Sequence, residues 1–196
     1  MLTIFTTPKD FIGEFNIIQY NALNSWRALS QEIEIILIGD SLGTSEAAKS
    51  IKAKHIKDVE QSSKGTPTLS GLFQIAQETA QNNILCYVNA DIIMPESILD
   101  VINALQARKG KFMAVGYRWD LDVTDSVHFI DDEVRTNFWS EANKNTQKHA
   151  CTGIDYFIFR KGTFQYFPRL AIGRFGWDNW LLWKSRRMRI PLIDVS

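Results

Sequence analysis

The sequence lacks most of the features that mark a specialised class of protein. It has two cysteines, Cys86 and Cys151, which are too few for a disulfide scaffold or for a zinc site built on thiolates. No apolar run approaches the roughly 20 residues of a transmembrane helix. Lys and Arg together number 22, as do Asp and Glu, so the net charge is zero. Because nucleic-acid-binding domains usually carry a basic excess, we expect no nucleic-acid partner.

Three motifs that would identify a cofactor or metal site are also missing. No Gly-x-Gly-x-x-Gly follows the first strand-like run, which argues against a dinucleotide site. Lys64-Gly65-Thr66 has the wrong order for a phosphate-binding loop, and no His-Glu-x-x-His occurs. The chain begins without a signal-peptide pattern and is poor in cysteine, so we expect a cytoplasmic location.

The first half alternates apolar runs with helical periods. Strand-like runs cover residues 2–6, 33–38, 84–88 and 112–115, with a weaker one at 56–59. Helices are expected over residues 15–29 and 45–54, from Thr66-Pro67, where Thr would be the N-cap, and from Pro95. Strands without polar alternation are buried on both faces. The sequence of 196 residues therefore predicts a single α/β domain whose mostly parallel central sheet is flanked by helices.

The second half has a different character, so we divide the chain into residues 1–116 and 117–196. Residues 117–149 are polar and rich in acids, which indicates a loop-rich insertion with room for one hairpin. Residues 151–183 are dense in aromatic side chains, most of them core candidates, and a basic cluster at 184–189 precedes a final strand-like run. The basic cluster is a solvated helix face, or else it meets an anionic membrane surface or an acidic partner.

Candidate ligand-binding residues follow the predicted strands. In open α/β sheets, ligands bind beyond the carboxyl ends of the strands. The residues there are Thr6, Thr7, Asp40, Lys64 and Asp91. Two acids beside loops that carry Lys and Thr suit a nucleotide whose phosphates are bridged by a metal ion. Each also has a structural interpretation: Asp91 as a cap, Asp40 as a turn residue and Lys64 as a solvated loop lysine.

Two acids in the second half are candidates of another kind. Asp155 follows Gly153-Ile154, and Asp178 lies between Trp177 and Trp180. An aspartate flanked by tryptophans, as Asp178 is, should be partly desolvated, which raises its pKa towards that of a general base. The alternative for Asp178 is an acid in the first turn of a helix, where the macrodipole favours negative charge.

Together these segments resemble the GT-A-type nucleotide-diphospho-sugar transferases over essentially the whole chain. The stretch from Leu85 to Ile92 resembles the strand that leads into the Asp-x-Asp metal motif of this family, with Asn89 in place of the first acid. Residues 153–157 resemble the acceptor-side element, and residues 171–180 resemble the segment that holds the catalytic base.

The resemblance implies a role for each candidate. The donor would be a UDP- or GDP-linked sugar, Mn²⁺ or Mg²⁺ would be bound by Asp91, and Asp178 would be the catalytic base of an inverting, hexosyltransferase-like enzyme. The residues implied for the donor are Thr6, Thr7, Asp40, Lys64, Asn89 and Asp91. Those implied for a glycan, lipid-linked or small-molecule acceptor are Gly153, Asp155, Arg174 and Trp177. Arg174 could equally form a structural ion pair.

Two departures from the family pattern support a second hypothesis. Asn89 carries no negative charge, and the chain ends at Ser196 without the histidine that many relatives have after their last core strand. A non-catalytic relative that binds a nucleotide, a glycan or a protein partner would account for both. A sugar nucleotidyltransferase is disfavoured because Thr6-Thr7-Pro8-Lys9 has no glycine.

Overall fold

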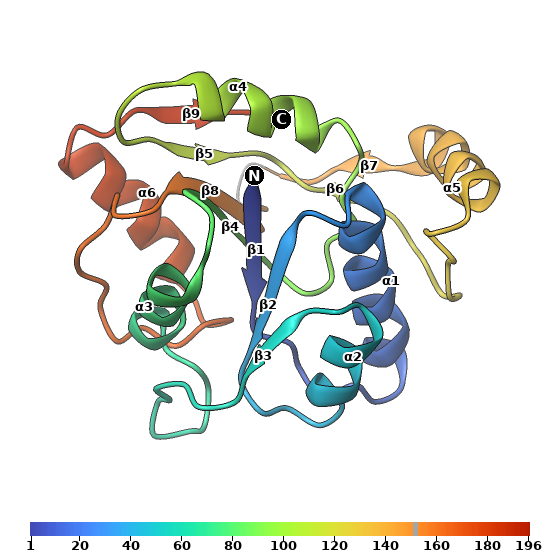
Figure 1. Ribbon diagram of the computed structural model, residues 1–196, viewed down its shortest axis with the longest axis horizontal. Coiled ribbons are helices and arrows are strands. Elements are labelled where there is room, and N and C mark those ends of the chain that lie inside the picture. The colour runs from blue at the N-terminus through green and yellow to red at the C-terminus, as the bar shows by residue number, and fades with distance from the viewer. Residues whose placement is uncertain (151–152) are drawn as a thin grey trace.

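The computed structural model describes residues 1–150 and 153–196 and contains a seven-stranded sheet between helices (Figure 1). The strand order is β3-β2-β1-β4-β8-β5-β9. The strands are β1 (Leu2–Thr6), β2 (Glu34–Ile38), β3 (Lys54–Ile56), β4 (Ile84–Val88), β5 (Met113–Val115), β8 (Tyr156–Arg160) and β9 (Leu192–Asp194). The predicted α/β class with a mostly parallel sheet is confirmed.

One strand of this sheet, β8, runs against the others. It lies between β4 and β5 and pairs antiparallel with both. Residues 156–160 belong to the aromatic segment of the sequence and are not predicted there as a strand. Phe157, Ile158 and Phe159 are fully buried, as expected of a strand covered on both faces. Since β8 and β9 come from the second half of the chain, residues 1–116 and 117–196 build one sheet together.

Helices cover the two faces of the sheet and produce two cores. They are α1 (Glu14–Leu29), α2 (Thr44–Ser50), α3 (Leu69–Thr79), α4 (Ile98–Ala107), α5 (Asp132–Asn145) and α6 (Trp177–Arg187). Helices α1, α2 and α4 pack on one face, and α3 and α6 pack on the other (Figure 1). Neighbouring strand residues alternate between the cores, so that Ile4 belongs to the first and Phe5 to the second.

The core beneath α3 and α6 is built around aromatic rings. Phe73 of α3 lies at its centre, with ring centroids 5.1 Å from Phe5, 5.5 Å from Tyr87, 5.6 Å from Phe159 and 5.0 Å from Phe167. Edge-to-face and offset stacked rings at these separations add to the free energy gained by burial. Most of the aromatic segment is therefore core, as the sequence indicated.

The start of α3 differs from the prediction. The N-cap is Thr68, whose hydroxyl accepts from the N–H of Gly71 at 3.1 Å, and the helix begins at Leu69. Thr66 and Pro67 lie before it, in extended chain that pairs Pro67 with Gln61. This pairing, continued by the N–H of Thr68 donating to Glu60, keeps the chain extended for two further residues.

The acid-rich segment 117–149 is also more regular than expected. It contains the helix α5 between two short strands, β6 (Trp119–Asp120) and β7 (Gln147–Lys148), which pair antiparallel. The N-cap is Asp131, whose carboxylate accepts from the N–H groups of Glu133 and Val134. Asp132 and Glu133 lie in the first turn, where acids are stabilised by the macrodipole. Ala142 is the one buried residue of α5. The sequence of this helix therefore has no regular spacing of apolar residues from which it could be predicted.

Among residues 1–150 and 153–196, no helix combines the length and the apolar character needed to cross a membrane.

We predict that Phe73→Ala lowers the free energy of unfolding by about 3–5 kcal/mol, because it leaves a cavity among four rings. For a chain of this size, each kcal/mol shifts the melting temperature by about 2–4 °C, which thermal denaturation resolves. Phe175→Ala is the matched control, because Phe175 is 102% exposed. Equal melting temperatures for the two variants would contradict a core centred on Phe73.

Candidate functional site

The site lies at the edge of the sheet where the parallel strands end. Asn89 and Asp91 directly follow β4, and Asp155 directly precedes β8. Because β4 and β8 are antiparallel neighbours, the end of one strand meets the start of the other. The backbone N–H of Asn89 donates to the carbonyl of Asp155 at 2.9 Å. The strand pairing thus brings together two segments that are 66 residues apart in the sequence.

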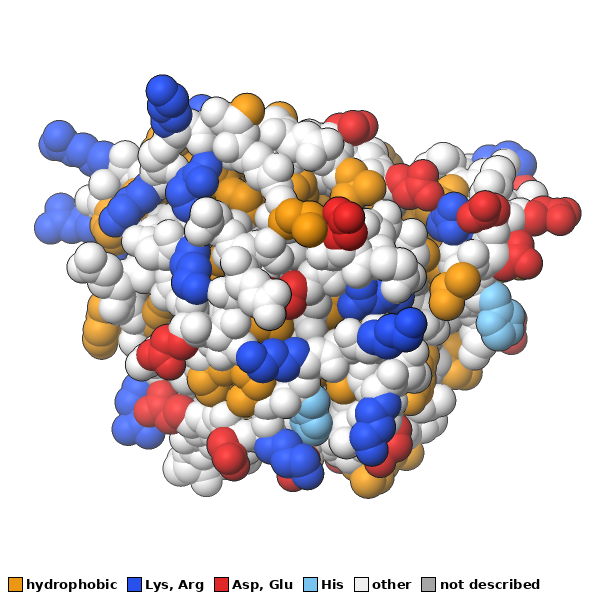
Figure 2. All heavy atoms as spheres, viewed as in Figure 1, with side chains coloured by type: hydrophobic (Ala, Val, Ile, Leu, Met, Phe, Trp, Pro, Cys, Tyr) orange, Lys and Arg blue, Asp and Glu red, His pale blue; other side chains and the backbone are white. Residues whose placement is uncertain are grey.

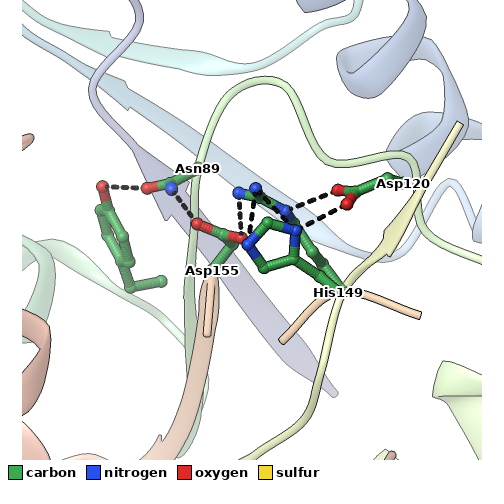
Figure 3. Close-up of polar contacts among 6 residues, drawn as sticks. Asn89, Asp120, His149 and Asp155 are labelled. Carbon is green, nitrogen blue, oxygen red and sulfur yellow. Dashed lines mark hydrogen bonds and ion pairs between the residues drawn. The ribbon is translucent and has the colours of Figure 1, made fainter. Parts of the chain in front are cut away.

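Asn89 joins a series of hydrogen bonds between buried and partly buried groups (Figure 3). The Tyr87 hydroxyl donates to Asn89 Oδ1 at 2.9 Å, and Asn89 Nδ2 donates to Asp155 Oδ1 at 2.7 Å. Arg118 Nη1 donates to Asp155 Oδ2 at 2.9 Å. Both carboxylate oxygens of the buried Asp155 therefore have partners, as an ionised group in such a place requires. Asn89 therefore donates a hydrogen bond to Asp155 at the position where the Asp-x-Asp motif has its first acid.

The same series of hydrogen bonds continues into residues that the sequence does not predict as part of the site. Arg118 Nε donates to Asp120 Oδ1 at 2.9 Å, and His149 Nδ1 donates to Asp120 Oδ2 at 2.6 Å. Arg118 Nη2 is 3.2 Å from His149 Nε2, which can accept once Nδ1 holds the proton. The hydrogen bond from His149, together with Arg118, holds the pKa of Asp120 below its usual range.

The short β6–β7 pair positions this part of the site. Asp120 pairs with Gln147, and the N–H of His149 donates to the carbonyl of Arg118 at 3.1 Å. A Cβ at Gly153 would collide with the ring of His149. The buried glycine at this position therefore allows the His149 ring to lie against the backbone of Gly153. No local motif signals these residues, because 31 positions separate Arg118 from His149.

Asp91 differs from Asp155 in that its charge is not neutralised by a direct partner among the described residues. Partial burial raises the pKa of the Asp91 carboxyl, and the negative charge of Asp155 raises it further, while the backbone N–H of Asp91 itself and the charges of Lys9 and Arg118 act in the opposite direction. The residue nevertheless keeps exposed surface at the protein boundary. An accessible carboxylate whose negative charge is under-compensated attracts a cation.

Trp177 brings the start of α6 to this network. Its ring lies 5.1 Å from that of Tyr87 and 5.4 Å from that of Phe157. Burial, followed by the charges of Asp91 and Asp155, raises the pKa of Tyr87, so its hydroxyl stays protonated and donates to Asn89. Asp178 follows Trp177 in the first turn of α6, is partly exposed, and accepts from the N–H of Asn179 at 2.8 Å. This position is compatible with both interpretations of Asp178.

The residues predicted for the nucleotide lie at the ends of β1 and β2. A Cβ on Gly39, whose φ is 112°, would be 3.2 Å from Thr7 Oγ1, so these two strand exits lie side by side. Asp40 is exposed and lies 3.4 Å from Lys57 Nζ. Thr6 is fully buried, and its hydroxyl has no hydrogen-bond partner within the described part of the chain. Thr6 therefore does not border open space in this conformation.

Two other predicted residues lie in exposed loops outside the hydrogen-bonded network. Lys64 is in the turn closed by Gln61 and Pro67, and its backbone N–H is 3.4 Å from the hydroxyl of Ser62. Arg174 is exposed in the loop before α6, and no ion pair involving it is found in the described structure. The structural ion pair that was the alternative for Arg174 is therefore absent from residues 1–150 and 153–196.

Few side chains at the site are available to coordinate a metal ion. Among the described residues, no three His, Cys, Asp or Glu side chains are arranged to hold a metal. Asp155 is already fully hydrogen-bonded, which leaves Asp91 as the available carboxylate. Mg²⁺ sites often use one or two protein carboxylates together with substrate phosphates and water. The residues therefore fit a cation that is shared with a bound diphosphate, rather than one enclosed by protein alone.

Comparison with known proteins shows what fold this is. No protein-family model and no curated protein sequence matches the chain. A solved structure from Desulfovibrio desulfuricans G20, assigned as a nucleotide-diphospho-sugar transferase, matches 99% of this chain and 79% of its own, with a TM-score of 0.60 and 12% identity. Glucosyl-3-phosphoglycerate synthase from Mycobacterium tuberculosis matches 100% of this chain and 70% of its own, with a TM-score of 0.57 and 12% identity.

The mycobacterial enzyme also matches in complexes with a nucleotide and a metal. One holds Mn²⁺, uridine diphosphate and phosphoglyceric acid, with a TM-score of 0.58 and 12% identity over 99% of this chain and 68% of that one. Another holds Mg²⁺ and uridine diphosphate. The fold is thus that of the GT-A-type nucleotide-diphospho-sugar transferases, as the sequence resemblance implied.

We predict that Asp91→Asn raises the melting temperature of the free protein at neutral pH. A carboxyl whose folded pKa is raised loses stabilisation as pH rises from its unfolded pKa, about 3.9, through the folded one. The difference between the variant and the unaltered protein should vanish near pH 3 and grow towards pH 7, which thermal denaturation against pH measures. The matched control is Asp58→Asn, at an exposed acid outside the site. A melting temperature lowered at neutral pH would mean that Asp91 has a stabilising partner.

Proposed function

We propose that the protein is a glycosyltransferase that moves a sugar from a nucleotide-diphosphate donor to an acceptor hydroxyl. The observation that carries the proposal is the position of Asp91. In a GT-A-like sheet, it follows β4 directly, its charge is under-compensated, and it is accessible from solvent. Ligands of open α/β sheets bind at this edge.

The donor is expected to be UDP- or GDP-linked and to carry a hexosyl group. Thr7 follows β1 and Asp40 follows Gly39 at the end of β2, and the contact of Gly39 with Thr7 places both strand exits where they can contact the base or ribose. Thr6 would contribute after a rearrangement that exposes its hydroxyl. Lys64 reaches the donor if the loop of residues 57–68 moves towards the sheet edge. Asn89 holds Asp155 in place and, through it, Arg118.

Asp91 would hold Mn²⁺ or Mg²⁺ together with the donor phosphates. When bound, such an ion supplies Lewis-acid stabilisation of the charge that develops on the leaving diphosphate. The complexes of the mycobacterial enzyme with Mn²⁺ or Mg²⁺ and uridine diphosphate support the proposal of a divalent ion. Within this chain, the raised pKa of Asp91 means that protons compete with the cation, so cation binding strengthens as pH rises.

Asp178 is proposed as the base that accepts the proton of the acceptor hydroxyl. The acceptor oxygen would then bond to the anomeric carbon as the bond from that carbon to the diphosphate breaks, with inversion of configuration. The packing of Trp177 on Tyr87 supports this role because it anchors the first turn of α6 beside Asn89 and Asp155. A glycan, lipid-linked or small-molecule acceptor would contact Gly153, Asp155, Arg174 and Trp177.

A second function is favoured by the hydrogen bonds of Asn89 and Asp155. Their side chains satisfy each other and Arg118, which leaves one carboxylate for a cation. A protein that binds a nucleotide or a glycan without turnover would retain this arrangement. The two functions differ in turnover and share nucleotide binding.

We predict that uridine or guanosine diphosphate with Mn²⁺ raises the melting temperature of the protein more than either component alone. A ligand at a hundredfold its dissociation constant adds about 2.7 kcal/mol to stability, which is several degrees for this length. Asp91→Asn should abolish the synergy. If no nucleoside diphosphate stabilises the protein with or without metal, the donor site is wrong. Stabilisation that is independent of Mn²⁺ would contradict the role of Asp91.

We predict that Asp178→Asn lowers the rate of sugar transfer by about 10²–10⁴-fold, the usual contribution of a general base. Donor binding in the thermal assay should be unchanged, because Asp178 does not contact the diphosphate in this proposal. Asp100→Asn is the matched control, since Asp100 is an exposed acid in the first turn of α4. Equal transfer rates for the two variants would remove Asp178 from the mechanism. Donor binding without transfer or donor hydrolysis in the unaltered protein would support the binding function.

A further inference from the structure

The positive charge of this protein is concentrated in three segments that contain no acid. Residues 101–119, 156–177 and 179–193 hold no Asp or Glu, and each carries four Lys or Arg residues, twelve of the 22 in the chain. Since the net charge is zero, the acids are displaced to the rest of the molecule. The basic cluster seen in the sequence is therefore part of a larger separation of charge.

The fold brings two of these segments together. Strand β5 pairs with β9, and the N–H of Met113 donates to the carbonyl of Pro191 at 2.9 Å. The α4–β5 loop thus lies beside the end of α6. We call this surface the basic patch. Its six exposed cations are Arg108, Lys109, Lys111, Arg186, Arg187 and Arg189. Figure 2 shows Lys and Arg side chains, with no acidic ones among them, over this part of the molecule at the upper left.

A partly buried arginine holds the loop of the basic patch in place. Arg160, at the end of β8, donates through Nη2 to the carbonyl of Arg108 at 2.6 Å and through Nε to that of Gly110 at 3.1 Å. Its guanidinium also lies 5.7 Å from the centre of the Phe112 ring. None of the six cations forms an ion pair in the described structure. The fold therefore keeps like charges together without compensating them.

Exposed apolar side chains lie among these cations. Trp183 is 56% exposed and lies one turn before Arg187 on the outer face of α6, while Met188 is 38% and Leu192 is 39% exposed. Trp favours the boundary between water and lipid, and arginine side chains reach from apolar surroundings to charged headgroups. Met188 and Leu192 have no ring to stack on nucleic-acid bases, so the combination fits a lipid surface better than RNA.

The position of the basic patch is compatible with a working donor site. It lies at the amino ends of β5 and β9, whereas Asn89 and Asp91 follow the carboxyl end of β4. Because β4, β5 and β9 run in the same direction, these are opposite edges of the sheet. A surface held against the basic patch leaves the site edge open to a water-soluble donor.

We propose that the basic patch docks the protein on an anionic phospholipid membrane. Each Lys or Arg near such a surface contributes to binding through its charge, and Trp183 adds apolar contact with the headgroup region. This proposal stands on the charge and exposure of the basic patch and does not require the proposed sugar transfer.

The test is sedimentation of the full chain with phosphatidylcholine vesicles that contain or lack phosphatidylserine. We expect binding to the anionic vesicles alone. The affinity should fall when salt is raised from about 0.1 M to 1 M, since the Debye length then shrinks from about 10 Å to 3 Å. Equal binding to both kinds of vesicle, or binding to neither, would overturn the proposal.

Variants locate the binding surface. Neutralising Lys109, Arg186 and Arg187 together with Gln should weaken binding to anionic vesicles by about a hundredfold. The matched control neutralises Lys49, Lys52 and Lys54, three exposed lysines of the α2–β3 region, and should bind like the unaltered protein. Trp183→Ser should weaken binding by about tenfold while the salt dependence remains.

All of these substitutions are at surface positions, and melting temperatures verify that each variant is folded. Equal vesicle binding by the two triple variants would overturn the proposal. So would tight binding of single-stranded RNA through the same arginines in a protein that ignores vesicles, which would make the basic patch a nucleic-acid surface.

Discussion

The pairing of Asn89 with Asp155 is the contact on which the rest of the site depends. It consists of a backbone hydrogen bond of 2.9 Å and a side-chain hydrogen bond of 2.7 Å between the end of β4 and the start of β8. An aspartate at position 89 would place two carboxylates in hydrogen-bond range, with like charges in a half-buried location. Asparagine removes that repulsion and supplies a donor. The departure from the family's Asp-x-Asp pattern therefore has a structural reason: the neighbouring strand brings its own acid to the same place.

This substitution changes how charge is distributed over the site. Asp155 is neutralised locally by Arg118, whose guanidinium also binds Asp120. Within the described part of the chain, Asp91 is the acid of the site that has no ion-pair partner, and burial together with the charge of Asp155 raises its pKa. The two acids of the site therefore differ in their surroundings. Asp155 is bound within the protein, and Asp91 would be the carboxylate available to the proposed cation. The proposal of sugar transfer and the alternative of nucleotide binding both rest on this division.

The candidate site and the basic patch, which lie at opposite edges of the sheet, have opposite electrostatic character. The edge at the carboxyl ends of the strands holds Asp91, Asp120 and Asp155 around Arg118, whereas the basic patch at the other edge has no acid in its segments. The net charge of zero does not show that acidic and basic residues are separated in this way. Zero net charge is the reason for expecting no dedicated nucleic-acid binding, and it gives no information about local surfaces. Segment-by-segment charge, read together with the β5–β9 pairing, reveals the asymmetry.

Local pattern was enough to predict the class of fold and the position of Asp91. Buried apolar runs can be identified without knowing their neighbours, and the residue after a strand must lie at the edge of the sheet. The strand β8, the helix α5 and the start of α3 could not be found in this way. Phe157 to Phe159 are as apolar as a helix core, α5 buries almost nothing, and the cap of α3 was decided by pairing with residues 60–61.

The partners of Asp155 could not be predicted from the sequence either. Arg118 and His149 belong to a polar segment without motifs, and they meet because β6 and β7 pair. The sequence by itself therefore determined most of the buried strands and the residues that follow them, Asp91 among them, since an apolar run and its end are properties of a local stretch. The tertiary structure alone decided which distant groups share a proton or a charge, since that depends on which strands become neighbours.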